Sequence, residues 1–160
     1  IEFAGYLDGS ATRGAFPTWA TPFGPFGSMI GYDADFTDVA RKLTRNGARL
    51  VAVSMHDRGP FWYNQLAHTI YRAAENRVAI VRSDWRYASC VIDQHGRIVA
   101  GPAGSEANDI VMMNVALTQS GTIYTKIGDI FAMLSLAGMV VFLLCDTAVR
   151  LWGDAARGTG

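Results

Sequence analysis

The sequence has no excess of either charge sign and only two cysteines. Its 160 residues include 14 Lys or Arg and 14 Asp or Glu, and no segment concentrates the basic side chains. A protein that binds nucleic acid presents a basic patch or stripe, so we expect no nucleic-acid partner. Half of the residues are apolar, which is enough for the core of one domain without disulfides or metals. We therefore expect partners among proteins and lipids, and no cofactor.

The two cysteines are not expected to form a disulfide. Cys90 lies in a predicted inner strand, and Cys145 lies near the end of a long apolar run. A disulfide needs the two Cα atoms within about 7 Å of each other. We expect two separate thiols, with Cys90 a buried structural residue that is chemically inert.

A nucleophile is missing from the turn where one is expected. Residues 27–33 (GSMIGYD) read as an apolar strand that enters a tight turn, and a helix opens at residues 35–38. A strand-to-helix elbow of this kind presents one side chain at the end of a sheet. That place is taken here by Gly31, which has no side chain, with Tyr32 and Asp33 beside it. We expect Asp33 to cap the following helix.

Alternating strand and helix patterns predict an α/β fold, with a mixed sheet and helices on one face. Residues 37–46 predict a helix whose apolar side is Val39, Ala40 and Leu43, ended by Asn46-Gly47. Residues 61–76 predict a second helix with an apolar stripe at helical spacing. The predicted strands are residues 28–32, 49–54, 78–81, 87–93 and 97–100, the last two joined by a hairpin turn at Gln94-His95-Gly96.

A long apolar run follows these elements. Residues 130–145 (IFAMLSLAGMVVFLLC) carry no charge and lack the polar face of a helix packed on a domain surface. As a helix the run extends about 24 Å, short of a hydrocarbon core of about 30 Å, but it lengthens if it continues through Trp152, with Asp146 and Arg150 paired four residues apart. We predict a transmembrane helix over residues 127–152, and a buried core helix is the alternative. The predicted membrane anchor residues are Ile130, Phe131, Leu134, Val141, Phe142, Leu144 and Trp152.

The charges that flank this run predict its orientation. Arg150 and Arg157 follow the apolar run of residues 130–145, whereas only Lys126 immediately precedes the predicted helix. Basic residues concentrate on the cytoplasmic side, so we expect residues 153–160 to be a short cytoplasmic tail and the domain of residues 1–126 to lie on the opposite side. In a bacterium this is a single-pass protein of the inner membrane with a periplasmic body.

Four stretches, in this order, resemble the carbon–nitrogen hydrolase (nitrilase) superfamily, and within it the bacterial apolipoprotein N-acyltransferases. Residues 21–33 are similar to the family's strand and Cys-Tyr-Glu elbow, and residues 72–76 (RAAEN) to its Arg-Ala-x-Glu-Asn helix end. Residues 91–97 (VIDQHGR) are similar to its Ile-Asp-x-x-Gly-Arg hairpin. Residues 122–129 (TIYTKIGD), directly before an apolar run, indicate the acyltransferase branch, because soluble nitrilases have no such helix.

The resemblance implies part of an α-β-β-α sandwich, namely the C-terminal half of the family's catalytic domain with its last membrane helix. Two sheets ordinarily pack face to face in that domain. A half would leave an apolar sheet face that needs another partner.

The resemblance also implies a cysteine nucleophile, a glutamate base and a lysine that helps to hold the oxyanion. Gly31 stands in the place of the cysteine and Asp33 in the place of the glutamate that follows it. No lysine precedes Gly31, and Glu2 is the only glutamate before it, too close to the elbow to match the base. The chain begins with Ile1 and has no basic region before an apolar one, so we expect a leading segment that has been removed or is not represented. We expect all three catalytic roles to be vacant.

Other polar residues allow a catalytic interpretation that we do not favour. Ser54, His56 and Asp57 follow a strand end, where α/β folds carry function, and His56 with Asp57 is a candidate base and orienter. Loop polar residues are common, and catalysis here is the minor alternative. His68 and His95 are expected at the surface.

Three aromatic residues have two open interpretations, and two glycines have a structural one. Trp62, Tyr63 and Trp85 are candidate interface residues, and packing in the core is an equally open alternative. Gly24 and Gly27 are expected to permit tight turns.

The sequence therefore predicts a catalytically inactive, membrane-anchored relative of the N-acyltransferases. Its expected role is a structural or assembly subunit of a membrane complex, for which bioenergetic and photosynthetic assemblies are plausible hosts, and its partners are other membrane-protein subunits and the lipid bilayer. The alternative is an N-acyltransferase-like enzyme or fragment that transfers an acyl group to a lipoprotein amine. A third class, a periplasmic lipid or peptide binder, requires a cleft behind Gly31.

Overall fold

The computed structural model describes residues 16–56, 59–85, 87–103, 110–118 and 121–157. The chain divides into two compact units, residues 1–126 and residues 127–160. The first unit holds the sheet and the helices that pack on it, and the second holds one long helix.

A five-stranded mixed sheet forms the centre of the first unit, as the sequence predicts. The strands lie in the order β1-β2-β3-β4-β5. The first three are parallel to one another, and β4 and β5 continue the sheet as an antiparallel hairpin. The strand bounds are Phe26–Ile30 (β1), Leu50–Met55 (β2), Ala79–Asp84 (β3), Ser89–Ile92 (β4) and Ile98–Ala103 (β5).

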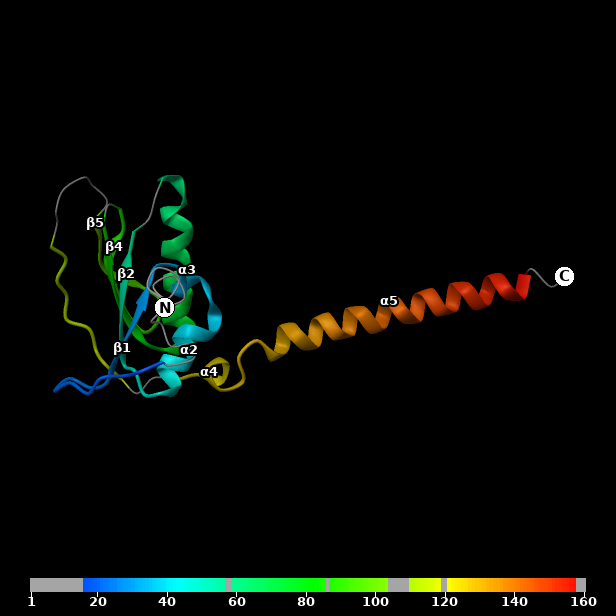
Figure 1. The fold of residues 1–160 in the computed structure, drawn as a ribbon, viewed down its shortest axis with the longest axis horizontal. Coiled ribbons are helices and arrows are strands. Elements are labelled where there is room, and N and C mark those ends of the chain that lie inside the picture. The colour runs from blue at the N-terminus through cyan, green and yellow to red at the C-terminus, as the bar shows by residue number, and fades with distance from the viewer. Residues whose placement is uncertain (1–15, 57–58, 86, 104–109, 119–120, 158–160) are drawn as a thin grey trace, which may run out of the picture. The chain divides into compact units, whose positions relative to one another are not determined.

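Two α-helices, α2 and α3, lie together on one side of the sheet (Figure 1). A 3-10 turn, η1, joins β1 to α2, and a second one, η2, precedes α3. A short helix, α4, ends the first unit. The helix bounds are Gly31–Asp35 (η1), Thr37–Arg45 (α2), Gly59–Phe61 (η2), Trp62–Asn76 (α3) and Ile123–Ile127 (α4).

The core lies between the helices and one face of the sheet. Val51 and Val53 of β2 are buried against Leu43 of α2 and the stripe of α3 that includes Leu66 and Ala73. These apolar residues recur at helical spacing on α2 and α3 and alternate along β2, so local periodicity is enough to predict them. Both predicted helices are confirmed, with their apolar sides facing the core.

The other face of the sheet is more open in the part of the chain that the structure describes. Ile30 of β1 is 56% exposed and Val81 of β3 is 38% exposed, and Ser54 and Ser83 are exposed beside them. Such a face agrees with the sheet of a sandwich that carries helices on one side only.

The first strand ends earlier than predicted. Residues 28–32 were expected to be extended, but β1 stops at Ile30 because Gly31 has a φ of +54°, which leaves the β region. Gly24 supports a turn as predicted, since its N–H donates to Thr21 O at 3.0 Å and its φ is +123°. Gly27 does not lie in a turn. It lies within β1, where an added Cβ would come within 2.9 Å of Leu43 Cδ2, so glycine is needed there for the close approach of α2.

The third strand is longer than predicted. Residues 78–81 were expected, but β3 runs from Ala79 to Asp84 and includes Arg82. Arg82 is buried and its guanidinium donates to Ala88 O at 3.1 Å, to Thr69 Oγ1 at 3.2 Å and to Asp84 Oδ2 at 2.9 Å. A buried ion pair with these further hydrogen bonds keeps the strand regular through a charged residue.

The turn between β4 and β5 is organised by Asp93. Its Oδ1 accepts hydrogen bonds from the backbone N–H groups of His95 at 2.8 Å and Arg97 at 2.9 Å. Burial raises the pKa of Asp93, but these two donors and the charges of Arg97 and His95 outweigh it, so the pKa lies below its ordinary value. The predicted hairpin is confirmed, and Asp93 is its main polar contact.

Replacing Asp93 by alanine is expected to lower the free energy of unfolding at pH 7 by about 1–2 kcal/mol, because two backbone donors lose a charged acceptor. A lowered pKa in the folded state stabilises the protein above the unfolded pKa of about 3.9, and that stability is lost as the pH falls through the folded value. The difference between Asp93→Ala and the parent protein should therefore shrink below pH 4 in urea unfolding followed by circular dichroism. A difference that is the same at pH 7 and pH 3 would contradict this assignment, and Asp93→Asn, which keeps one acceptor oxygen, should lie in between.

The second unit contains α5 (Ile130–Arg157). Residues Ile130–Arg150 form a segment of 21 residues that is long and apolar enough to cross a membrane, and none of its most apolar window is buried. A helix of this length extends about 31 Å, which matches a hydrocarbon core of about 30 Å. Asp146 and Arg150 form the predicted ion pair, with Arg150 Nε 2.8 Å from Asp146 Oδ2. The apolar anchor residues named from the sequence all lie on this helix.

Candidate functional site

The elbow after β1 is open at the position where a side chain would project. Gly31 is the first residue of η1 and has a left-handed backbone, and an added Cβ would meet no atom within 4 Å. Tyr32 beside it is 66% exposed. The elbow therefore has the form that presents a single residue at the end of a strand, and it has room for a side chain that glycine lacks.

Asp33 closes this elbow. Its Oδ2 accepts a hydrogen bond from the backbone N–H of Ile30 at 3.0 Å, upstream of the turn. The residue that directly precedes α2 is Phe36, and Phe36 has no side-chain hydrogen bond to the helix. The contact of Asp33 thus stabilises η1, whereas the sequence predicted a cap on the following helix.

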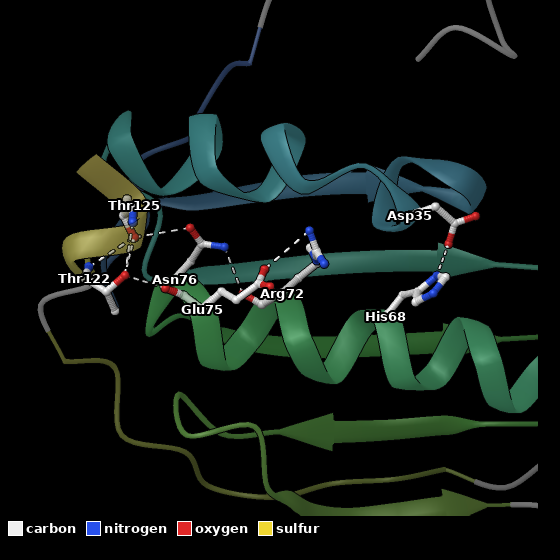
Figure 2. Close-up of polar contacts among 7 residues, drawn as sticks. All are labelled: Asp35, His68, Arg72, Glu75, Asn76, Thr122 and Thr125. Carbon is white, nitrogen blue, oxygen red and sulfur yellow. Dashed lines mark hydrogen bonds and ion pairs between the residues drawn. The ribbon is translucent and has the colours of Figure 1, made fainter. Parts of the chain in front are cut away.

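Asp35, the last residue of η1, contacts two side chains of α3. One carboxylate oxygen, Oδ1, lies 2.7 Å from His68 Nδ1, and the other accepts a hydrogen bond from Gln65 Nε2 at 3.0 Å. Figure 2 shows the Asp35–His68 contact, in which His68 projects from α3 toward η1. His68 is partly exposed, as expected for a surface residue, but its pairing with Asp35 was not predicted. The two residues are 33 positions apart, and no local pattern connects them.

The carboxyl ends of the parallel strands β1, β2 and β3 lie on the same side of the sheet. Gly31, His56 and Trp85 directly follow these strand ends and therefore lie on that side. Ligands of open α/β sheets bind outside these strand ends. The His56 and Trp85 rings are in edge contact, with centroids 4.6 Å apart. Trp85 is 68% exposed. Asp57, the proposed orienter of His56, lies outside the described residues, so the structure leaves that pair untested.

The three candidate interface aromatics have different surroundings. Trp62 is partly buried against the core and stacks on Tyr87, with ring centroids 6.2 Å apart. Tyr63 is 57% exposed and lies in edge contact with Trp62. Trp62 therefore packs in the core, while Tyr63 and Trp85 present their rings at the surface.

Cys90 has the surroundings of a structural thiol. It is buried in β4, as predicted, and burial raises the pKa of its thiol to about 11, with the Arg82 charge lowering the pKa and the Asp84 charge raising it. The thiolate is the reactive form of cysteine, so this thiol is almost entirely protonated near neutral pH. Cys145, the other free cysteine, is on α5.

The described residues also include no group of three or more His, Cys, Asp or Glu side chains that could hold a metal ion. The candidate site consists of the open elbow at Gly31, the ring of Trp85, and the α3 side chains Gln65 and His68 that contact Asp35.

The RAAEN stretch forms the C-terminal end of α3 and has a structural role. Arg72 Nη1 lies 3.3 Å from Glu75 Oε2, and Asn76 Nδ2 donates to Arg72 O at 3.0 Å. Figure 2 shows these side chains at the end of α3 opposite to His68, next to Thr122 and Thr125. Thr125 Oγ1 donates to Asn76 Oδ1 at 3.2 Å. The helix end thus binds the segment that leads to α5.

Comparison with known families agrees with this geometry. Residues 6–124 match the model of the carbon–nitrogen hydrolase family. The chain belongs to this family. The match extends over the elbow, the α3 helix end and the β4–β5 hairpin, so the resemblance inferred from the motifs is confirmed.

Among curated proteins, the carbon–nitrogen hydrolase chain is similar to apolipoprotein N-acyltransferases. It is 30% identical over 123 residues to that of Geobacter metallireducens, in a match that covers 74% of this chain and 23% of the relative. It is 26% identical over 149 residues to that of Thermotoga maritima, covering 85% of this chain and 27% of the relative. The chain thus spans about a quarter of the length of the curated relatives it matches.

Among solved structures, the fold is similar to that of Saccharomyces cerevisiae Nit3, a member of branch 10 of the nitrilase superfamily. The TM-score is 0.55 at 23% sequence identity, and the match covers 61% of this chain and 40% of Nit3. This likeness shows the fold, and it confirms the predicted α/β architecture of nitrilase type.

Proposed function

We propose that this protein is a catalytically inactive, membrane-anchored member of the carbon–nitrogen hydrolase family that acts by contact with other proteins. The observation that carries the proposal is Gly31. It occupies the open elbow position after β1, where the resemblance to the N-acyltransferases implies a cysteine. Covalent acyl transfer needs a nucleophile activated by a neighbouring base, and glycine supplies none.

Among the described residues, a thiol and two amines are candidate replacements for that chemistry. The Cys90 thiol is buried with its pKa raised to about 11, and its position in β4 is away from the elbow. The two lysines of the sequence, Lys42 and Lys126, lie on α2 and α4. Lys42 forms an ion pair with Asp38 of the same helix.

The proposed role in a complex rests on the apolar helix α5 and on the exposed apolar side chains of the sheet domain. Helix α5 supplies a single membrane span, which we place in the bacterial inner membrane with the sheet domain on the periplasmic side and residues 153–160 in the cytoplasm. The exposed sheet face around Ile30 and Val81 and the exposed rings of Tyr63 and Trp85 offer apolar surface to partner subunits. We infer that the partners are other membrane proteins.

The second candidate function is acyl transfer to a lipoprotein amine. It is favoured by the 30% identity to the Geobacter metallireducens apolipoprotein N-acyltransferase. It requires a nucleophile other than residue 31, because the elbow itself carries none.

Purified full-length protein in phospholipid vesicles tests the two functions directly. We expect no covalent acyl-protein by mass spectrometry and no acyl transfer to a peptide with an N-terminal diacylglyceryl cysteine. The Geobacter metallireducens relative serves as the positive control. We also expect the protein to be recovered with other membrane proteins after gentle solubilisation and affinity capture. Measurable acyl transfer by a protein recovered alone would overturn the proposal in favour of the second function.

A further inference from the structure

The segment before α5 is bound to the C-terminal end of α3 by several hydrogen bonds. The Gly121 N–H donates to Asn76 O at 3.0 Å, and Thr122 Oγ1 donates to Glu75 O. Thr125 Oγ1 donates to Asn76 Oδ1 at 3.2 Å. Three residues of this segment, Gly121, Thr122 and Thr125, thus contact the last two residues of α3, as Figure 2 shows for the two threonines.

Asn76 is the centre of these contacts. It is fully buried, and Thr125 is 4% exposed. Both ends of the Asn76 amide are used, because Nδ2 donates to Arg72 O and Oδ1 accepts from Thr125. Buried polar groups are costly unless they are paired, so Asn76 and Thr125 each stabilise the other's position. No acidic or apolar side chain of similar size offers the same donor and acceptor.

The two threonines also fix the local conformation of the segment. The Thr125 N–H donates to Thr122 Oγ1 at 3.0 Å, and the Thr122 N–H donates to Thr125 Oγ1 at 3.0 Å. This reciprocal pattern is that of a capping box, and it starts α4. The segment is therefore both folded in itself and attached to α3.

The attachment ends close to the start of α5. Between Lys126 and Ile130, the first residue of α5, the chain has only Ile127, Gly128 and Asp129. Three extended residues reach at most about 11 Å. If the segment were released, residues 121–129 would form a tether that reaches about 30 Å.

We propose that the Asn76–Thr122–Thr125 cluster is a clamp that sets the length of the tether between the sheet domain and the membrane span. With the clamp closed, the tether is residues 127–129, and its release would lengthen the tether to residues 121–129. The part of this inference that concerns the bilayer rests on the proposed membrane span of α5. The attachment of residues 121–126 to α3 does not depend on it.

Removal of the Thr125 hydroxyl tests the clamp. Thr125→Val keeps the β-branched shape but loses the hydroxyl that contacts Asn76 and Thr122, whereas Thr125→Ser keeps the hydroxyl and is the matched control. A nitroxide attached at Ile123→Cys in a Cys145→Ser background reports the mobility of the segment in detergent micelles. We expect a rotational correlation time that is several-fold shorter in Thr125→Val and unchanged in Thr125→Ser. An unchanged spectrum in Thr125→Val would overturn the clamp.

A second variant shows whether mobilisation in Thr125→Val results from loss of the clamp or from misfolding. Thr122→Val removes the donor to Glu75 O at a partly exposed position and should mobilise the label in the same way. The far-ultraviolet circular dichroism of both valine variants should match that of the parent. An immobile label in Thr122→Val, with the domain folded, would also overturn the proposal, because Thr122 is a member of the clamp.

The tether length is measured in phospholipid vesicles. In the Cys145→Ser background, energy transfer from a dye at Phe23→Cys, an exposed site on the sheet domain, to acceptors on lipid headgroups should fall in Thr125→Val and remain unchanged in Thr125→Ser. Alkaline carbonate extraction of the same vesicles tests the membrane span separately. If carbonate releases the protein, α5 is not a membrane span, and the spectra in micelles still test the clamp. If the protein is retained and the energy transfer of Thr125→Val is unaltered, the clamp does not set the length of the tether.

Discussion

Replacing Arg82 by methionine is expected to lower the free energy of unfolding by about 3–5 kcal/mol, because it leaves the buried Asp84 carboxylate without its cation. The side chains of both residues are fully buried. Arg82 also satisfies Ala88 O and Thr69 Oγ1, and these lose a donor at the same time. A loss of this size is a large fraction of the 5–15 kcal/mol that is typical of a domain. Chemical unfolding of the full chain in detergent, followed by near-ultraviolet circular dichroism, measures it.

Two further variants separate the ion pair from general damage to β3. Ser83→Ala changes an exposed neighbour in the same strand and should shift the free energy by no more than about 0.5 kcal/mol. The double variant Arg82→Met with Asp84→Met should recover much of the loss, because an apolar pair of similar volume replaces a buried ion pair at little cost. A loss below about 1 kcal/mol in Arg82→Met would show that solvent reaches Asp84 and that the pair is not the main support of β3.

A cysteine placed at Gly31 is expected to be alkylated about two hundred times faster than Cys90 at pH 8. The Cys90 pKa is about 11, so about 0.1% of its thiol is ionised at that pH, compared with about a quarter of an ordinary thiol with a pKa of about 8.5. The site also has open space around the new Cβ. The left-handed backbone at this position should cost about 1 kcal/mol of stability once a side chain is added. Labelling of Gly31→Cys in a Cys145→Ser background with iodoacetamide, followed by mass spectrometry, gives both rates.

Gly47 provides the matched reference for this measurement. It also has a positive φ, of +98°, with no atom within 4 Å of an added Cβ, and it is exposed. Gly47→Cys should therefore be labelled at a rate close to that of Gly31→Cys. A Gly31→Cys thiol that reacts as slowly as Cys90 would contradict an open elbow. We expect the Gly31→Cys variant to remain without acyl transfer, because a thiol alone lacks the base and the oxyanion donors of covalent acyl transfer.

Local sequence patterns predicted most of the fold. The helices at residues 37–46 and 61–76 and the β4–β5 hairpin rest on apolar periodicity and on turn residues, which act over a few positions. The resemblance of four ordered motifs then identified the family. The vacancy of the nucleophile position at Gly31 stays a prediction, and the structure shows open space around this residue.

Polar contacts between distant residues were not predictable. His68 meets Asp35 across 33 positions, and Thr125 meets Asn76 across 49. A single sequence gives no signal for such pairs, because each residue alone reads as a surface group. The burial of Arg82 is a further example, because its contacts with Asp84 and Ala88 O are known only from the structure.

The last strand departed from the prediction because of edge geometry. Residues 97–100 were predicted, but β5 runs through Gly101 and Pro102 to Ala103. Gly101 has a φ of +82°, and the β4–β5 register shifts between Ser89 and Ile92. β5 is at the end of the strand order, where a proline does not interrupt a second ladder and a bulge is tolerated.

The contacts at the end of α3 limit how a related chain could lose the apolar helix α5. The last carbonyl groups of a helix have no partner within the helix, and here Glu75 O and Asn76 O are satisfied by Thr122 and Gly121. The residues that lead toward the apolar helix are thus also the terminal cap of a core helix. A descendant that lost α5 alone would keep a stable sheet domain, whereas one that lost the chain from residue 121 onward would have to evolve a new cap for α3 at the same time.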